Sequence, residues 1–167
     1  GTFFLGKNWL SRLFKELTIN LKEETLTLDL PGLEQFCENL SQNLDHGNIL
    51  CLFGELGSGK TTFARSLIRS IYKKQNSEAP HSIKSPSFPI LITYEVNNIE
   101  IYHYDLYRIS NTSELFELNI FENLENSITL IEWPEIILKE LNSKKYFSVK
   151  FDIIDSFSRK INHNIFL

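Results

Sequence analysis

Long apolar runs, glycine and proline are all scarce in this chain of 167 residues. No apolar stretch reaches the roughly 20 residues that a membrane-spanning helix needs, so no membrane association is expected. The chain also does not open on a charged stretch followed by an apolar core and a cleavage site, and we expect a cytoplasmic protein. Seven glycines and five prolines form no linker or repeat array, which favours a single domain at this length.

Cysteine is almost absent as well. Cys37 and Cys51 lie inside apolar periodic segments and have neither a CxxC nor a Cys/His spacing. Buried structural thiols are therefore favoured over a metal or redox site.

The chain lacks a strong charge of one sign. It has 17 basic and 21 acidic residues and a formal net charge of −4, so no global field attracts a phosphate backbone. DNA binding is not expected, and contact with RNA would need a local basic patch or an intermediary protein. With 42% hydrophobic residues, the chain has enough apolar material for a packed core.

The sequence does contain an alternation of strand and helix patterns. This predicts a three-layer α/β domain of the P-loop NTPase type, whose mixed sheet includes antiparallel hairpin strands. We expect this domain to span residues 28–167, after an N-terminal extension, residues 1–27, of undefined role. Helices are predicted over 8–17, 33–44 (closed by Gly47), 59–71, 112–124 and 134–141, and strands over 24–30, 48–53, 88–96, 99–105, 127–131, 146–154 and 160–166. Asn97 and Asn98 fit a tight hairpin turn, because asparagine tolerates positive φ.

The clearest chemical signal is the segment from Gly54 to Thr61, GELGSGKT, which satisfies the phosphate-loop pattern G-x-x-x-x-G-K-[ST]. Its glycines let backbone N–H groups approach phosphate oxygens, and the helix that follows presents its positive N-terminus to the same anion. Lys60 is expected to bridge the β- and γ-phosphates, and Thr61 to offer a hydroxyl to Mg²⁺. An apolar strand before the motif and an amphipathic helix after it favour nucleotide binding over a chance glycine-rich turn.

A phosphate loop also needs an acidic group from a neighbouring strand to hold or order the metal and its waters. Glu132 ends the apolar run that starts at Ile128, and Asp105 ends the run that starts at Ile99. One of these two carboxylates would hold Mg²⁺ through water while the other orients the attacking water. The sequence does not assign one of these two roles to Glu132 and the other to Asp105.

Five blocks of the sequence together resemble the TsaE family, also called YjeE, of bacterial P-loop ATPases in tRNA threonylcarbamoyladenosine (t6A) biosynthesis. The blocks span about residues 28–135. They are GELGSGKTTFAR (54–65), KSPSFPILITYE (84–95), IYHYDLYRI (101–109), ELFELNIFENL (114–124) and LIEWPE (130–135).

The resemblance implies specific roles. Lys60 and Thr61 would bind ATP and Mg²⁺, Glu132 of the EW motif would help to bind Mg²⁺, and Asp105 would act near the triphosphate. The Ser85-Pro86 loop would sense the nucleotide. The implied catalytic residues are Asp105, Glu132 and Lys60, the implied metal ligands are Thr61 and Glu132, and the implied nucleotide-binding residues are Glu55, Gly57, Ser58, Gly59, Lys60, Thr61 and Thr62.

Some positions depart from the family pattern or stay ambiguous. Glu55 replaces a usual aspartate and keeps the charge, whereas Ser87 and Pro89 stand where threonines are common, so no hydroxyl acts at position 89. Trp133 is either a functional aromatic or part of the core, and residue type slightly favours the core. Arg108 either serves the site beside Asp105 or pairs with the acidic segment 114–125.

The implied activity is hydrolysis of ATP to ADP and phosphate. The resemblance places this activity in the t6A modification of adenosine 37 in tRNAs that read ANN codons. Hydrolysis would drive or reset a partner complex of TsaB and TsaD, and the chain would meet tRNA only through that complex.

A small-molecule kinase is an alternative, although the five arginines are scattered and no lid-like insertion is evident. A nucleotide-dependent binding module without turnover is another, while the absence of an N-K-x-D segment disfavours a GTPase.

Overall fold

The computed structural model describes residues 22–141 and 145–166. The helix predicted over residues 8–17 lies outside these ranges. In the described part of the chain, no helix is long and apolar enough to cross a membrane. The elements in chain order are β1 (Glu24–Leu28), α2 (Leu30–Ser41), β2 (Ile49–Phe53), α3 (Lys60–Lys74), β3 (Leu91–Val96), β4 (Ile99–Asp105), α4 (Thr112–Glu117), α5 (Ile120–Asn123), the 3-10 helix η1 (Leu124–Asn126), β5 (Ile128–Glu132), the 3-10 helix η2 (Pro134–Ile136), β6 (Phe147–Ile153) and β7 (Arg159–His163).

The strands form one sheet in the order β1-β7-β6-β2-β5-β4-β3. Strand β2 pairs in parallel with β5 and β6, and β5 pairs in parallel with β4. Antiparallel hairpins extend the sheet on both sides: β3 pairs with β4, and β7 pairs with β6 and β1. The predicted mixed sheet is confirmed, and β2 and β5 are its almost fully buried central strands.

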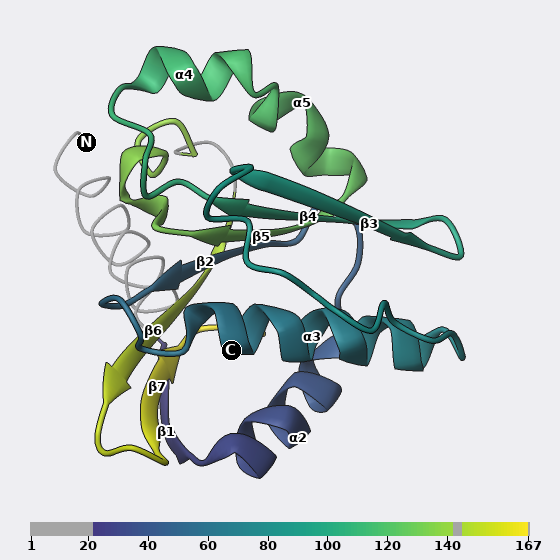
Figure 1. Ribbon diagram of the computed structural model, residues 1–167, viewed down its shortest axis with the longest axis vertical. Coiled ribbons are helices and arrows are strands. Elements are labelled where there is room, and N and C mark those ends of the chain that lie inside the picture. Colours follow the sequence, from purple (N-terminus) through teal and green to yellow (C-terminus); the bar gives the residue numbers. More distant parts are fainter. Residues whose placement is uncertain (1–21, 142–144, 167) are drawn as a thin grey trace, which may run out of the picture.

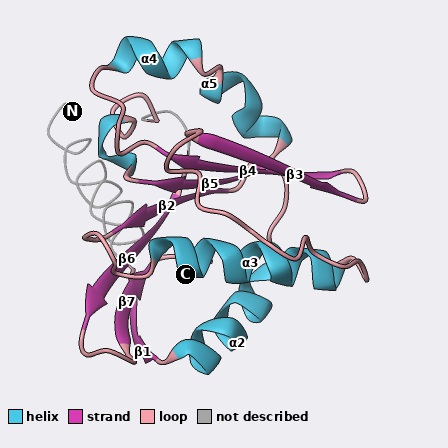
Figure 2. Cartoon of the chain, viewed as in Figure 1, coloured by secondary structure: helices cyan, strands magenta, loops and turns pink. Residues whose placement is uncertain are grey.

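Helices cover both faces of this sheet (Figures 1 and 2). Helices α2 and α3 pack on one face, over a core that includes Phe63, Leu67 and Leu130. Helices α4 and α5 lie over the other face, where Tyr104, Leu115 and Ile131 belong to a second core. The three-layer α/β architecture is therefore confirmed.

The start of helix α2 differs from the prediction. The strand expected over 24–30 ends at Leu28 because Asp29 caps the helix, its Oδ1 accepting a hydrogen bond from Gly32 N at 2.9 Å. Because β1 pairs with β7, the sheet includes residues that precede the expected domain boundary at residue 28. The helix ends at Ser41, so Gly47 does not close it and instead adopts a φ of 91° just before β2.

Two predicted helices are shorter or broken. The stretch 112–124 divides into α4, α5 and η1, because Asn119 takes a left-handed conformation with a φ of 53° between the first two. The helix predicted over 134–141 is a single 3-10 turn, η2. The tight turn at Asn97-Asn98 is confirmed, with φ values of 47° and 66°. Cys37 and Cys51 are both buried free thiols, also as predicted.

Candidate active site

The phosphate loop joins the carboxyl end of β2 to the start of α3. Gly59 precedes the first helical residue, Lys60. Its φ of 110° is a backbone angle that residues with a Cβ rarely adopt. At Gly54 the constraint is close approach, since a Cβ there would collide with Ser58 Oγ and come within 3.0 Å of the Phe151 carbonyl oxygen. The loop therefore needs glycine at these positions for its backbone to close tightly.

Arg159 holds the loop from the opposite end of the sequence. It begins β7, and its Nε donates a hydrogen bond to Ser58 O at 3.0 Å, while one of its terminal nitrogens lies 3.4 Å from Gly57 O. Another terminal nitrogen donates to Asp155 O at 2.8 Å within the β6–β7 connection. This guanidinium thus ties the C-terminal hairpin to the middle of the phosphate loop.

Lys60 lies buried under the loop. Its Nζ donates hydrogen bonds to the carbonyl oxygens of Gly54 and Glu55, the latter at 2.9 Å, and lies 4.2 Å from the ring centroid of Trp133. Burial lowers the pKa of Lys60, and the carboxylates of Glu132 and Asp105 act in the opposite direction. The ammonium group thus lies between the loop backbone and the acidic residues.

Glu132 connects the loop to the carboxyl end of the central strand β5. Its Oε1 accepts a hydrogen bond from Thr61 Oγ1 at 2.7 Å, and its Oε2 lies 2.7 Å from His103 Nε2. Glu132 is only 2% exposed and His103 is fully buried. These two contacts use both carboxylate oxygens and fix the side chain in one orientation.

Asp105 lies next to Glu132 across the β4–β5 ladder, where the two residues are paired in register. Its Oδ1 accepts a hydrogen bond from Tyr107 N at 3.0 Å. Burial raises the pKa of Asp105, and the nearby Glu132 charge acts in the same direction, while the Tyr107 N–H opposes them. The structure thus brings the two sequence-predicted carboxylates together beside Lys60 and Thr61.

The other predicted loop residues differ in exposure. Ser58 is buried, Glu55 and Gly57 are exposed on the loop, and Thr62 is exposed on the first turn of α3. Ser58 Oγ has no hydrogen-bond partner among the described residues. This hydroxyl is left unsatisfied inside the loop, as expected for a group that meets a ligand.

The two ambiguous residues have defined contacts. Trp133 is not a core residue: it is half-buried, has a φ of 55°, and packs against Tyr107 and the Lys60 ammonium. The contacts of Arg108 lie with the segment before β3, and its guanidinium is 5.0 Å from the centroid of the Phe88 ring. Its guanidinium donates to the carbonyl oxygens of Ser87, at 3.0 Å, and Phe88.

Sequence reasoning assigned no role to His103 or Arg159. The signal for His103 was available, since in the strand Ile99–Asp105 it stands two residues before Asp105 and therefore on the same face. No comparable signal pointed to Arg159, because its contact with Ser58 joins residues 101 positions apart.

The residues present fit a nucleotide with Mg²⁺. The loop offers backbone N–H groups, the unpartnered Ser58 hydroxyl and the Lys60 ammonium to phosphate oxygens, and Thr61 and Glu132 offer oxygen ligands of the kind Mg²⁺ prefers. The described residues contain no group of three or more His, Cys, Asp or Glu side chains that could hold a metal alone. Mg²⁺ commonly binds through only one or two protein groups together with phosphate oxygens and water.

Comparisons of the chain with known proteins identify one family. The family described as threonylcarbamoyl adenosine biosynthesis protein TsaE matches residues 29–161. The chain is 37% identical to the TsaE proteins of Rickettsia conorii and Rickettsia typhi over 142 residues, which are 85% of this chain and 73% and 89% of those proteins. It is 30% identical to TsaE of Aquifex aeolicus over 123 residues, covering 74% and 79% of the two chains. The crystal structure of Bacillus subtilis YdiB shares the fold with a TM-score of 0.61 at 20% identity, over 86% of each chain. The chain therefore belongs to the TsaE family of tRNA threonylcarbamoyladenosine biosynthesis proteins.

Proposed function

We propose that this protein is a Mg²⁺-dependent ATPase of t6A biosynthesis, acting in the modification of adenosine 37 in tRNAs that read ANN codons. The names of its relatives support the pathway, because the Rickettsia and Aquifex proteins are all tRNA threonylcarbamoyladenosine biosynthesis proteins. The loop and the two carboxylates support the reaction, in which ATP and water give ADP and phosphate.

One observation carries the ATPase proposal: the 2.7 Å hydrogen bond from Thr61 Oγ1 to Glu132 Oε1. It joins the end of the phosphate loop to the adjacent parallel strand, where P-loop NTPases place their hydroxyl and acidic residues. Because the hydroxyl donates its hydrogen bond to the carboxylate, the lone pairs of its oxygen stay available to a cation. Bound Mg²⁺ would neutralise the negative charge that develops on the phosphate oxygens during the reaction.

The remaining residues supply the other parts of the reaction. Lys60, Ser58 and the loop backbone would bind the β- and γ-phosphates by charge and hydrogen bonds. Both carboxylate oxygens of Glu132 are in contact with Thr61 and His103. Asp105 would therefore orient the attacking water and accept its proton. Its raised pKa makes it a stronger base than an exposed aspartate.

The arginine contacts favour a partner-dependent enzyme. P-loop enzymes gain about 10³–10⁵ in rate from an arginine that neutralises the transition state. Arg108, the arginine nearest to Asp105 in sequence, is bonded to the carbonyl oxygens of Ser87 and Phe88. We propose that TsaB and TsaD form the complex that hydrolysis drives or resets, that this complex supplies the missing group, and that tRNA is contacted through it.

Steady-state ATP hydrolysis tests this function, measured with and without TsaB and TsaD together with t6A formation on tRNA. We expect slow turnover alone, faster turnover with partners, and multiple-turnover t6A synthesis only when this protein is present. Glu132→Ala should lower hydrolysis at least ~100-fold, whereas Glu117→Ala, which removes an exposed carboxylate from α4, should not change it. Unchanged t6A synthesis after omission of the protein would refute the proposal, and phosphate transfer to a small molecule would indicate the kinase alternative.

A further inference from the structure

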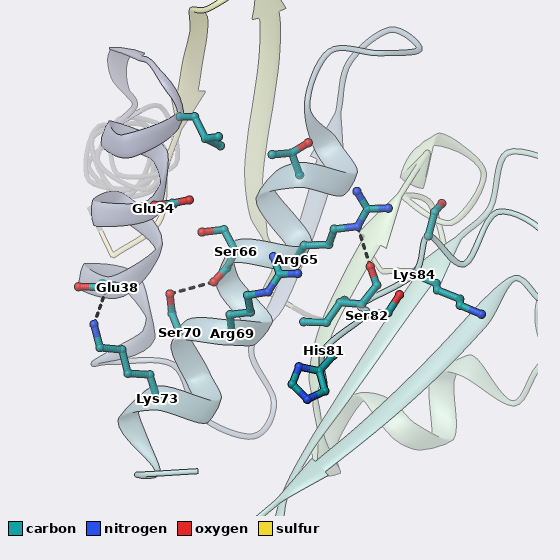
Figure 3. Close-up of a pocket in the computed structure, with 14 residues that line it drawn as sticks. Glu34, Glu38, Arg65, Ser66, Arg69, Ser70, Lys73, His81, Ser82 and Lys84 are labelled. Atoms are coloured by element: carbon teal, nitrogen blue, oxygen red, sulfur yellow. Dashed lines mark hydrogen bonds and ion pairs between the residues drawn. The ribbon is translucent and has the colours of Figure 1, made fainter. Parts of the chain in front are cut away.

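A groove of about 800 Å³ runs between α2, α3 and the segment before β3 (Figure 3). One wall follows α3 from Thr62, beside the phosphate loop, to Lys73, and another is formed by residues 81–85. Apart from Thr62, the residues that line the groove lie outside the phosphate loop and its first helical turn. Hydroxyl groups are frequent among them and come from Thr62, Ser66, Ser70, Ser82 and Ser85.

Three cationic side chains of α3 lie in a row along this groove. Arg65, Arg69 and Lys73 follow one another at intervals of four residues, which places them on one side of the helix and about 6 Å apart along its axis. Figure 3 shows Arg65 and Arg69 extending from α3 toward the segment that carries Ser82. Lys84 adds a fourth cationic side chain from that segment.

Three of these four cations keep donor groups that the described residues do not use. Arg65 uses its Nε, which donates a hydrogen bond to Ile83 O at 2.7 Å, and its terminal nitrogens have no acceptor there. Arg69 and Lys84 are exposed, and within residues 22–141 and 145–166 they form neither a hydrogen bond nor an ion pair. These donors are therefore available to an external anion.

The balance of charge in the groove is opposite to that of the whole chain. Four cationic and two acidic side chains line it, whereas the chain has a formal net charge of −4. Glu34 and Glu38 both belong to α2, and Glu38 already forms an ion pair of 2.7 Å with Lys73. The α3 wall and residues 81–85 together form a local basic patch of the kind that contact with RNA requires.

The chemistry of the lining suits a phosphate backbone. Arginine, lysine and serine are among the side chains with which proteins contact nucleic-acid phosphates. No phenylalanine, tyrosine or tryptophan is among the described residues that line the groove, so bases would not stack there. Interfaces between proteins have an apolar centre, whereas this groove has only Leu30 and Ile83 as aliphatic side chains. An RNA strand therefore fits the groove better than an acidic protein segment does.

We propose that this basic groove binds the phosphate backbone of tRNA directly. An RNA strand presents one phosphate per nucleotide, so a row of cations can bind successive phosphates without reading the bases. The identity of the RNA rests on the proposed function, because the relatives are tRNA threonylcarbamoyladenosine biosynthesis proteins. TsaB and TsaD would bring the tRNA into the complex, and the groove would add a contact of its own.

Fluorescence anisotropy of a labelled tRNA that reads an ANN codon tests this contact, with the full chain alone and no nucleotide present. We expect a dissociation constant of about 10⁻⁶–10⁻⁴ M, which is typical of binding to phosphates without base recognition. With Arg65, Arg69 and Lys84 each neutralising a phosphate, the logarithm of the association constant should fall with the logarithm of the salt concentration with a slope of about −2 to −3.

Arg69→Glu should weaken tRNA binding about tenfold or more and reduce the salt slope by about 1, because it removes a phosphate contact and adds a negative charge. Arg69→Lys keeps the charge and should bind tRNA nearly as well as the unmodified protein. Lys160→Glu is the matched control and should bind tRNA normally. This exposed lysine alternates along β7 with Ile161, which packs under α2 and α3, so it lies on the other face of the sheet. ATP hydrolysis should be the same in all three variants.

Equal tRNA affinity of Arg69→Glu and the unmodified protein would overturn the inference, and so would a lack of tRNA binding by the unmodified protein at about 50 mM salt. Tighter binding of a polyglutamate peptide than of tRNA, lost in Arg69→Glu, would assign the groove to an acidic protein segment instead. The proposed function would survive each of these results if ATP hydrolysis and t6A synthesis still required this protein. Its own failure would be seen separately, as t6A synthesis that proceeds without the protein.

Discussion

His103 Nε2 lies 2.7 Å from Glu132 Oε2, between neighbouring parallel strands, and neither side chain is appreciably exposed. The imidazole contacts one oxygen of the carboxylate whose other oxygen accepts the Thr61 hydroxyl. His103 therefore positions Glu132 without lying beside the phosphate loop itself. Partners of this kind commonly change metal affinity or activity 10- to 100-fold when they are removed.

We expect His103→Ala to raise the Mg²⁺ concentration needed for half-maximal ATP hydrolysis by about tenfold or more. The variant should also lose about 3 kcal/mol of unfolding free energy, because a buried carboxylate loses a partner. Magnesium titrations of the hydrolysis rate and urea denaturation measure the two effects. His81→Ala removes an exposed imidazole and should change neither. A loss of stability with unaltered Mg²⁺ dependence would show a purely structural role for His103.

Lys60→Ala should weaken ATP binding by at least ~100-fold, because it removes the cationic side chain of the phosphate-loop motif itself. The side chain also donates to the carbonyl oxygens of Gly54 and Glu55, so the free loop should become less ordered. Calorimetry measures the affinity, and Lys74→Ala, at the exposed end of α3, controls for the loss of one positive charge. Comparable ATP affinity in a folded Lys60→Ala protein would reject the phosphate-loop assignment.

Asp105→Asn should nearly abolish hydrolysis but stabilise the folded protein near neutral pH. Burial raises the pKa of Asp105, so the folded state binds this proton more tightly than the unfolded chain does. The stability gained from protonation is present below the unfolded-state pKa and is lost as the pH rises through the folded-state pKa. Asparagine carries no such proton, so its advantage over aspartate should grow as the pH rises from the unfolded-state pKa, about 4, through the raised folded-state pKa.

Urea denaturation of both proteins across that pH range measures the difference. Asp152→Asn, at an exposed position on β6, is the matched control and should show little change in stability. A constant difference between Asp105→Asn and the unmodified protein would contradict the assigned direction of the shift.

The two thiols should be unreactive in the folded protein. Cys37 and Cys51 are both fully buried, and burial raises the pKa of Cys37 to about 12 and that of Cys51 even further. Because the thiolate is the reactive form, a thiol reagent at pH 8 should label neither residue within the time needed to label both in urea. Rapid labelling of Cys37 without denaturant would mean that the core under α2 and α3 opens readily, and rapid labelling of Cys51 would mean the same of the core on the α4–α5 face.

The elements of the site that depend on local sequence were predictable. The motif from Gly54 to Thr61 requires a tight turn and a following helix, and the structure contains both. Glu132 and Asp105 were expected at strand ends, and the parallel pairing of β4 with β5 brings them into register. The Asn97-Asn98 turn was predictable for the same reason, because it depends on the φ preference of two adjacent residues.

Contacts between distant segments were decided by the tertiary structure alone. The spacing of apolar residues and the turn preferences of single residues report on segments that are local in the chain. The sequence alone therefore determined the phosphate loop, the apolar strands and the hairpin turn. The partners of Glu132 depend on which strands become adjacent, and the contact of Arg159 with the loop depends on how β7 returns to the sheet. Trp133 adopts a positive φ angle that its residue type does not favour. These contacts and this backbone conformation depend on how the strands and helices pack together. Burial of the apolar side chains on the two faces of the sheet contributes more free energy than the local conformational preference of any single residue.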